Sequence, residues 1–259
     1  AAPRLRTSRW FLAGQAVILL SLVALPVARA VSIVVPPAVP PTQNNPLKVA
    51  VPYNWPQVVT DEQLHAVLTK LRPRLARPRP VISVVDHALR FWGPNATFAD
   101  PQCLSGQQML HMLLNHEAYV QAWGKDAAPL LYLGEHGISV RTQEGGNTAS
   151  HVDHTLATLA EIGLPLDAPV FTAEGTGTVA DILRQAVRDF SLNQAEYEWT
   201  AIALALYAPV REPWLSREGQ AIDFNLLARR IMRQGYRDGV CMGQHRLYSL
   251  AVLLQVDQT

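Results

Sequence analysis

The amino-acid sequence predicts an all-α protein built from stacked helical hairpins, as an α-solenoid or a closed double ring, with one small β-hairpin near residues 130–142. Three observations predict this fold. Most segments after residue 60 carry the signals that start and end helices. Two of these helices are apolar on nearly every side, and two others carry several arginines. Inner apolar helices that alternate with outer amphipathic ones are typical of layered helical folds.

Composition limits the functional classes. The chain has 259 residues, of which 49% are hydrophobic and 17% charged, so it can form a sizeable core and a disordered chain is excluded. Twenty-two lysines and arginines balance twenty-one aspartates and glutamates. Because neither sign of charge dominates, we expect no nucleic-acid partner and no electrostatic attraction to an anionic membrane.

Residues 1–30 have the layout of a signal peptide or an N-terminal membrane anchor. Three arginines precede nineteen uncharged residues, 10–28, and the tripeptide Ala-Arg-Ala at 28–30 matches a cleavage site. The uncharged run approaches the ~20 residues that span a bilayer, so both alternatives stay open. In either case we expect an extracytoplasmic protein, secreted or anchored, that contacts the membrane through this segment only.

A linker and a short helix come before the main domain. Residues 31–59 contain seven prolines and predict an extended linker. Residues 60–80 predict a short helix, with a capping box from Thr60 to Gln63, and a Pro/Arg-rich connector that ends it. The helical domain is expected over 81–259. Because the chain stops at LLQVDQT without a helix-ending glycine or proline, we leave open that this domain continues further.

Within this domain, most expected helices have a capping residue before them or a glycine after them. They are 82–92, 105–123 with a capping box from Ser105 to Gln108, 150–162, 179–190 capped by Thr178, 194–207 capped by Asn193, 222–234, and 242–259. The helices 194–207 and 242–259 are the apolar, inner ones, whereas 179–190 and 222–234 carry arginines and are expected to lie outside. The β-hairpin is expected in LLYLGEHGISVRTQ, around Gly134 and Gly137.

The first candidate site is the stretch SHVDHTLATLAEIG, residues 150–163. On a helical wheel His151, His154 and Glu161 share one polar face, and Asp153 falls outside it. Two imidazoles at i and i+3 can bind one metal ion, and neutral nitrogen donors suit zinc. Asp153 could orient an imidazole from the first turn. The alternative is the solvated face of a surface helix.

The second candidate site is the stretch GVCMGQHRLYSL. Cys241 and His245 are four residues apart and are expected on one face of a mostly apolar helix. A thiolate and an imidazole can both bind zinc, and they could equally be a nucleophile and its base. The remaining alternative is a core histidine bonded to a backbone carbonyl beside an inert cysteine.

The two stretches would form one site if both helices face a central cavity. The expected metal ligands are then His151, His154, Cys241 and His245. Glu196 and Glu198 precede Trp199, and a carboxylate held against apolar groups has a raised pKa. With Asp153, they are the candidate catalytic acids or bases. Alternatively, Glu196 serves only as the capping partner of Asn193.

Two further features are expected to be structural. Asp86, His87 and Arg90 fall on the helix 82–92 and are interpreted as a polar cluster. Cys103 and Cys241 could form a disulfide in an exported protein, although a chain of this size does not need one to fold.

A family resemblance rests on the stretch CMGQHRLYSLAVLLQ, which places Cys, Gly and His just before an apolar helix. Together with the alternation of inner and outer helices, residues 150–259 resemble the α/α-toroid class of terpenoid cyclases and protein prenyltransferases. In prenyltransferase β subunits Asp, Cys and His bind zinc, and the resemblance carries this role over only to Cys241 and His245. The chain has no clear QW repeat and no DxDD-type acid motif, so the resemblance does not imply cyclase activity.

Two functional hypotheses follow. The first is an enzyme that acts on a lipid or glycan of the cell envelope, through metal-bound water or an acid/base pair, with zinc as the expected cofactor. The second is a non-catalytic binding or scaffold protein of the cell envelope, whose polar clusters satisfy one another. The sequence defines neither the reaction nor the oligomeric state, so whether the chain is an enzyme stays open at this point.

Overall fold

The computed structural model describes residues 14–22, 39–49, 57–209, 212–235 and 240–259. About 48% of the structure is helical, alongside small antiparallel β-hairpins, so the all-α prediction holds only as a mostly helical fold. The toroid or solenoid arrangement stays a prediction.

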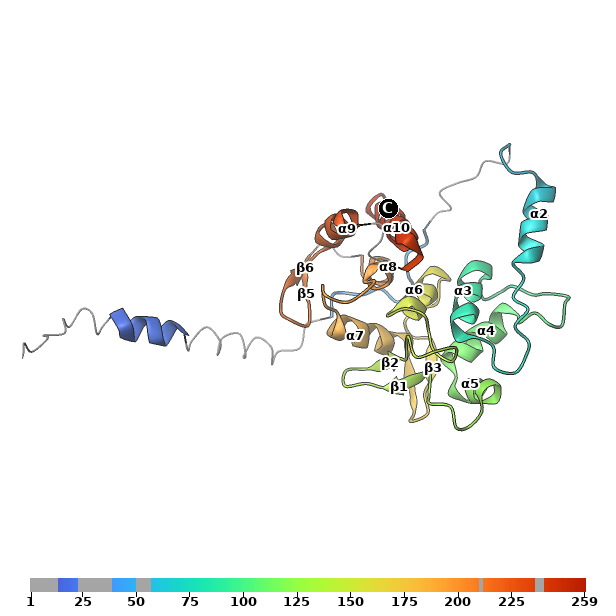
Figure 1. The fold of residues 1–259 in the computed structure, drawn as a ribbon, viewed down its shortest axis with the longest axis horizontal. Coiled ribbons are helices and arrows are strands. Elements are labelled where there is room, and N and C mark those ends of the chain that lie inside the picture. Colours follow the sequence, from blue (N-terminus) through green and yellow to red (C-terminus); the bar gives the residue numbers. More distant parts are fainter. Residues whose placement is uncertain (1–13, 23–38, 50–56, 210–211, 236–239) are drawn as a thin grey trace, which may run out of the picture.

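The helices are α2 (Asp61–Lys70), α3 (Ile82–Trp92), α4 (Gly106–Leu114), α5 (His116–Trp123), α6 (His154–Glu161), α7 (Val179–Asp189), α8 (Glu198–Tyr207), α9 (Phe224–Arg233), the short 3-10 helix η1 (Val240–Gly243) and α10 (Gln244–Asp257) (Figure 1). The antiparallel strand pairs are β1 (Leu131–Leu133) with β2 (Ile138–Val140), β3 (Pro169–Phe171) with β4 (Thr176–Thr178), and β5 (Trp214–Leu215) with β6 (Ala221–Ile222).

The N-terminal region is described only in part. Residues 14–22 are helical and exposed, while the rest of the predicted signal peptide or anchor lies outside the described residues. No helix in the described ranges is long and apolar enough to cross a bilayer. Within the expected linker, the backbone N–H groups of Gln43 and Leu47 donate to carbonyls at the end of α8, at 2.8 and 2.9 Å. This part of the Pro-rich segment is therefore attached to the helical domain instead of forming a free spacer.

Helix α8 is the centre of the domain. All of its residues are buried, and it packs against α6, α9 and α10, as Figure 1 shows. Its sequence, EWTAIALALY, combines small alanines with large apolar side chains, so neighbouring helices can approach it on every side. The prediction that this helix has no solvent-exposed face is confirmed.

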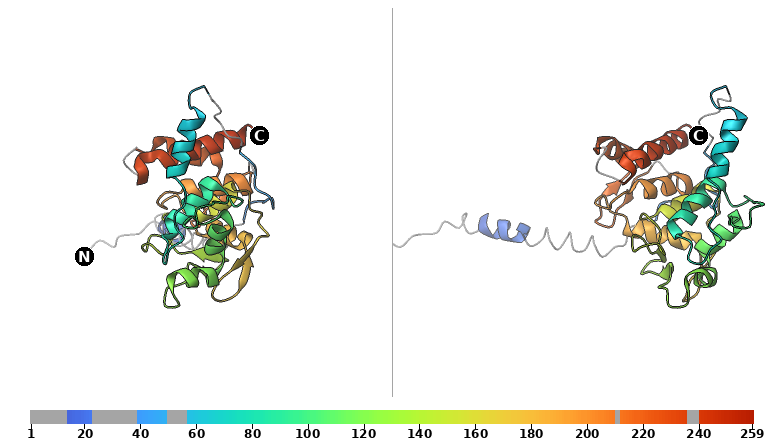
Figure 2. Two further views of the ribbon diagram at one scale, coloured as in Figure 1. Left: turned by 90° about the vertical axis from the view of Figure 1, so that its right-hand side faces the viewer. Right: turned by 45° about the vertical axis from the view of Figure 1, so that its right-hand side comes forward.

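Helix α10 was expected to be enclosed in the same way, and this prediction is wrong. Leu247 is 72% exposed and Leu254 is 58% exposed. Helices α9 and α10 lie at the end of the domain opposite α5, so α10 has neighbours on one side only (Figure 2). An apolar sequence alone does not tell an enclosed helix from one at the end of a domain.

Helices α7 and α9 are amphipathic, as predicted. Each buries apolar side chains on one face, among them Leu183 in α7 and Leu227 in α9. Each also presents arginines to solvent, including Arg184 and Arg229. Both helices therefore cover the core as outer elements.

Local capping signals located most helix ends correctly. Both predicted capping boxes form, at Thr60 with Gln63 and at Ser105 with Gln108. The predicted hairpin forms as β1–β2. The two other hairpins, β3–β4 and β5–β6, were not expected.

Three predicted helices differ because single residues interrupt them. Asn115, with φ −129° and ψ 117°, divides 105–123 into α4 and α5, and its side chain caps α5. Asp153 has φ 58°, so α6 begins at His154 and not at residue 150. Glu196 has φ 57°, so α8 begins at Glu198 and not at residue 194. Left-handed residues cannot continue a right-handed helix.

Candidate metal centre

The candidate site lies where the first turns of α6, α8 and α10 approach α3 (Figure 1). Four imidazoles, two carboxylates and one indole gather there. They are Asp86 and His87 from α3, His151 and His154 at the start of α6, Glu196 and Trp199 at the start of α8, and His245 from α10.

His151, Glu196 and His245 form a compact group of possible metal ligands. Nδ1 of His151 lies 2.5 Å from Oε2 of Glu196, and Nδ1 of His245 lies 3.6 Å from Oε1 of the same carboxylate. One ligand atom from each residue lies within 4.8 Å of the other two. The side chains of His151 and Glu196 are each 7% exposed and that of His245 is 15% exposed. Three donors from three separate segments therefore converge at a largely buried position.

The backbone around these donors is unusual. Of the six non-glycine residues with positive φ in the described ranges, four lie in the turns that carry the site: Asp153, Glu196, Cys241 and Met242. Such left-handed conformations cost on the order of 1 to 3 kcal/mol each in non-glycine residues. Strained residues tend to cluster at functional sites, where the surrounding structure holds them in place.

A polar contact stabilises the turn before α6. Oδ2 of Asp153 accepts hydrogen bonds from the Thr200 hydroxyl, at 2.5 Å, and from the Gln194 amide, at 3.5 Å. Burial raises the pKa of Asp153, although these two hydrogen bonds act in the opposite direction. Asp153 was a candidate catalytic residue that could orient an imidazole. Instead, its carboxylate ties the start of α6 to α8 and so helps to place His151.

A second carboxylate–imidazole pair adjoins the first. Nδ1 of His154 lies 2.9 Å from Oδ2 of Asp86, which also accepts a hydrogen bond from the Thr155 hydroxyl at 2.7 Å. Burial alone would raise the pKa of Asp86, but the interaction with His154 and these hydrogen bonds bring it below its usual value. In the neutral tautomer that donates its Nδ1 proton to Asp86, Nε2 of His154 would be an acceptor. Nε2 is buried and has no hydrogen-bond partner among the described residues.

Aromatic packing encloses these groups. The ring of Trp199 lies 4.4 Å from His154 and 4.7 Å from His245 between centroids, and His87 stacks on His154 at 4.4 Å. Burial, followed by repulsion from neighbouring histidines, lowers the pKa of both His245 and His87. A lowered pKa favours neutral imidazole, which is the form that binds metal ions.

The donor set could hold a zinc ion only after a rearrangement, since its ligand atoms lie within 4.8 Å of one another but not all at the spacing of a tetrahedral site. Zinc bonds of about 2.0–2.2 Å place the donors of a tetrahedral site roughly 3.3 Å apart. The 3.6 Å between His245 and Glu196 is close to this value, whereas the 2.5 Å between His151 and Glu196 is a hydrogen bond. These two side chains would have to separate by about 1 Å and give up the proton between them. Metal binding at this site therefore competes with protonation.

Four residues predicted for this site lie outside the group of possible ligands. Asp153 ties α6 to α8, and His154, which was expected to be a metal ligand, pairs with Asp86. Cys241 was expected to share a helix face with His245, but it lies in η1, before the left-handed Gly243, and is exposed. Glu198 was a candidate acid or base, but it forms a buried ion pair with Arg246 at 2.9 Å. Cys103 and Cys241 are both free thiols, so they do not form the disulfide that was considered.

The pairing of Asp86 with His154 was not predicted, although a signal for it exists. The sequence interpretation placed Asp86 in a structural polar cluster with His87 and Arg90 on its own helix. Ile82 and Leu89 are fully buried and mark the core-facing side of α3. Asp86 lies one turn after Ile82, on the same side. A carboxylate on the buried face of a helix needs a partner, and His154 is that partner.

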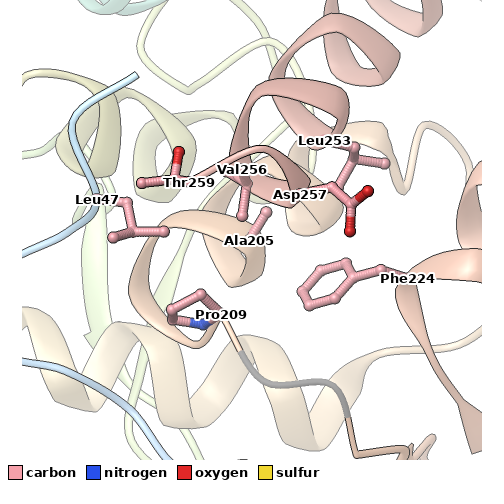
Figure 3. Close-up of a pocket in the computed structure, with 8 residues that line it drawn as sticks. All are labelled: Leu47, Ala205, Pro209, Phe224, Leu253, Val256, Asp257 and Thr259. Atoms are coloured by element: carbon pink, nitrogen blue, oxygen red, sulfur yellow. The ribbon is translucent and has the colours of Figure 1, made fainter. Parts of the chain in front are cut away.

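A separate pocket lies at the other end of α8 and α10 (Figure 3). Its volume is about 330 Å³ and its lining is mostly apolar, with contributions from Leu47, Ala205, Phe224 and Val256. Val256 lies eleven positions after His245 in α10, which corresponds to roughly 16 Å along the helix. None of the four expected metal ligands lines this pocket.

Comparisons with known proteins identify no family for this chain. No family model matches the chain, and the searches of curated proteins and of solved structures found no match.

The lowered pKa of His245 predicts a pH dependence of stability. Because the folded state binds this proton less tightly than the unfolded state, the contribution of His245 is fully present above pH 6.5 and is lost as the pH falls below that value. The groups around its ring are Glu196, His151 and His154. We expect the unfolding free energy of the metal-free protein to fall between about pH 7 and pH 5, and His245→Gln to reduce this slope. Urea denaturation across this range measures it, and an unchanged slope in His245→Gln would contradict the assignment.

Proposed function

We propose that this protein is a metal-dependent enzyme whose zinc ion is held by His151, Glu196 and His245. The observation that carries the proposal is the convergence of three donor atoms within 4.8 Å of one another, in side chains that are 7 to 15% exposed. Two imidazoles and one carboxylate are the ligands of one class of catalytic zinc site, in which a fourth position stays open. Structural zinc sites use four protein ligands instead. Three donors therefore favour a catalytic role.

Zinc at this position would supply Lewis-acid chemistry to water or to a carbonyl or phosphoryl group. The chain itself would supply the proton acceptor, which we assign to Nε2 of His154. The ring of His154 lies 5.7 Å from that of His151 between centroids, and Asp86 fixes its tautomer and orientation. In this assignment Glu196 is a metal ligand and not a general base.

We propose a lipid or a glycan of the cell envelope as the substrate, because the predicted N-terminal signal or anchor would export the domain. The mostly apolar pocket at the far end of α8 and α10 suits an acyl chain, and a lipid bound there would have to span the roughly 16 Å to His245 for its reacting group to reach the metal. The enclosed position of α8 supports the toroid or solenoid arrangement, which belongs to the same proposal.

A turnover experiment tests the enzymatic proposal. Metal-free protein is loaded with Zn²⁺ and incubated with phospholipid vesicles or with purified peptidoglycan fragments, and released products are identified by mass spectrometry. We expect zinc-dependent turnover of one preparation and its loss in His154→Ala, which leaves the three donor residues in place. Turnover that is unchanged in His154→Ala would contradict the role of His154. Zinc binding without turnover of either preparation would contradict catalysis on these substrates.

A non-catalytic binding or scaffold protein of the envelope is the second candidate. The observation that favours it is that the buried polar groups already pair, His151 with Glu196 at 2.5 Å and His154 with Asp86 at 2.9 Å. Such pairs stabilise a buried cluster without any ligand. A wild-type protein that binds no metal would favour this candidate over the first.

A further inference from the structure

Helix α10 carries His245, yet it buries few apolar side chains. Its buried residues are Arg246, Ser249 and Val252, and only the last of these is apolar. Leu247 and Leu254 are mostly exposed, while three other apolar residues are partly buried against the core. Polar contacts of the first turns of α10 therefore help to hold His245 in position.

One set of these contacts is the Arg90 clamp, formed by Arg90, Glu161, Trp199 and Tyr248. Nε of Arg90 pairs with Oε2 of Glu161 at 2.5 Å, and Nη2 donates to Oε1 at 3.3 Å. The guanidinium carbon lies 4.7 Å from the ring centroid of Trp199 and 4.4 Å from that of Tyr248. The Tyr248 hydroxyl also donates to Glu161. One guanidinium thus joins α3, α6, α8 and α10.

The clamp adjoins the metal donors directly. Tyr248 follows His245 by three residues, so both side chains lie on the same side of α10, one turn apart. Trp199 contacts Arg90, and its ring lies 4.7 Å from that of His245 between centroids. A shift of Tyr248 away from Arg90 would therefore move His245 relative to Glu196.

We infer that Arg90 is a positioning residue for the metal centre, which holds His245 at the distance from Glu196 that a metal ion requires. The inference rests on the proposed function, because it assumes that His245 is a ligand. An arginine suits this role because a planar guanidinium can pair with a carboxylate through two nitrogens while its faces stack on aromatic rings. A lysine ammonium cannot reproduce both contacts.

Arg90→Met and Arg90→Lys test the inference, with Arg141→Met as the matched control. The side chain of Arg141 is 14% exposed, against 17% for Arg90, and it also contacts a tyrosine and a glutamate, Tyr119 and Glu144. It directly follows β2, a strand that Figure 1 shows apart from α10. Metal-free proteins are titrated with Co²⁺, whose visible absorption reports affinity and coordination geometry. Loss of a supporting partner typically reduces metal affinity about 10- to 100-fold, and we expect this loss in Arg90→Met, with a changed spectrum.

We expect Arg90→Lys to restore only part of the affinity and Arg141→Met to stay within about twofold of wild type. Hydrogen exchange provides a second readout, in which the amides of α10 should exchange about tenfold faster in Arg90→Met and at the wild-type rate in Arg141→Met. The inference would be overturned if Arg90→Met kept the wild-type Co²⁺ affinity and spectrum, or if hydrogen exchange in α10 stayed unchanged. Either result would leave the proposed function intact. A wild-type chain that binds no Co²⁺ would overturn the proposed function itself.

Discussion

Glu196→Gln is expected to abolish stoichiometric zinc binding. The substitution keeps the size of the side chain but replaces a carboxylate whose oxygens lie 2.5 Å from Nδ1 of His151 and 3.6 Å from Nδ1 of His245. Because an amide oxygen is a poor zinc ligand, the loss of affinity should exceed the roughly 100-fold that removal of a supporting partner can cost. Competition with a chromophoric zinc chelator measures this loss.

The same substitution at Glu144 is the control, since this side chain is 62% exposed and lies outside the donor group. A ligand that binds only the folded state stabilises it by about 2.7 kcal/mol at a concentration of about 100 times its Kd. Wild type and Glu144→Gln should both show this stabilisation by zinc, and Glu196→Gln should not. Equal stabilisation of all three proteins would show that zinc binds elsewhere.

Asp86→Ala is expected to destabilise the metal-free protein by about 2 to 6 kcal/mol, because two buried donors lose their acceptor at a cost of about 1 to 3 kcal/mol each. Both Asp86 and His154 have side chains that are 0% exposed, and Thr155 donates to the same carboxylate oxygen. The substitution leaves the imidazole and the hydroxyl buried without their acceptor. Urea denaturation measures the change.

Asp86→Asn should cost less than Asp86→Ala, because the amide oxygen can still accept from both donors. Asp100→Ala provides a surface control, since its partner Arg74 has a side chain that is 61% exposed and such pairs contribute about 0 to 1 kcal/mol. A cost for Asp86→Ala no larger than that for Asp100→Ala would show that the buried pair is not needed for the fold.

The parts of the fold that local chemistry determines could be predicted from the sequence. Thr60 and Ser105 satisfy the first backbone N–H groups of their helices, and the predicted starts of α2 and α4 therefore hold. The starts of α6 and α8 could not be predicted in this way. Asp153 and Glu196 adopt left-handed conformations, and at Asp153 a bond with Thr200, 47 residues away, accompanies that conformation. Such a contact leaves no local pattern in the sequence.

In the candidate site, too, local sequence patterns predicted some features, and contacts between distant residues determine the others. His151 was selected on a helical wheel, although it precedes the helix; it joins the donor group because the turn before α6 faces α8. Cys241 was placed beside His245 by helical spacing, and the left-handed Gly243 separates them. Asp86 and Arg90 were interpreted as a local cluster, whereas their partners, His154 and Glu161, come from α6. Spacing within one helix therefore identified candidate residues but not their partners on other helices.

The proposed metal centre requires that His151, Glu196 and His245 together hold a single metal ion. Inductively coupled plasma mass spectrometry can test this on purified wild-type protein that has been dialysed against excess zinc and then against metal-free buffer. We expect about one zinc ion per chain in wild type and close to none in His151→Ala and His245→Ala. Wild-type protein without bound zinc, or the same zinc content in both variants, would contradict the proposed metal centre.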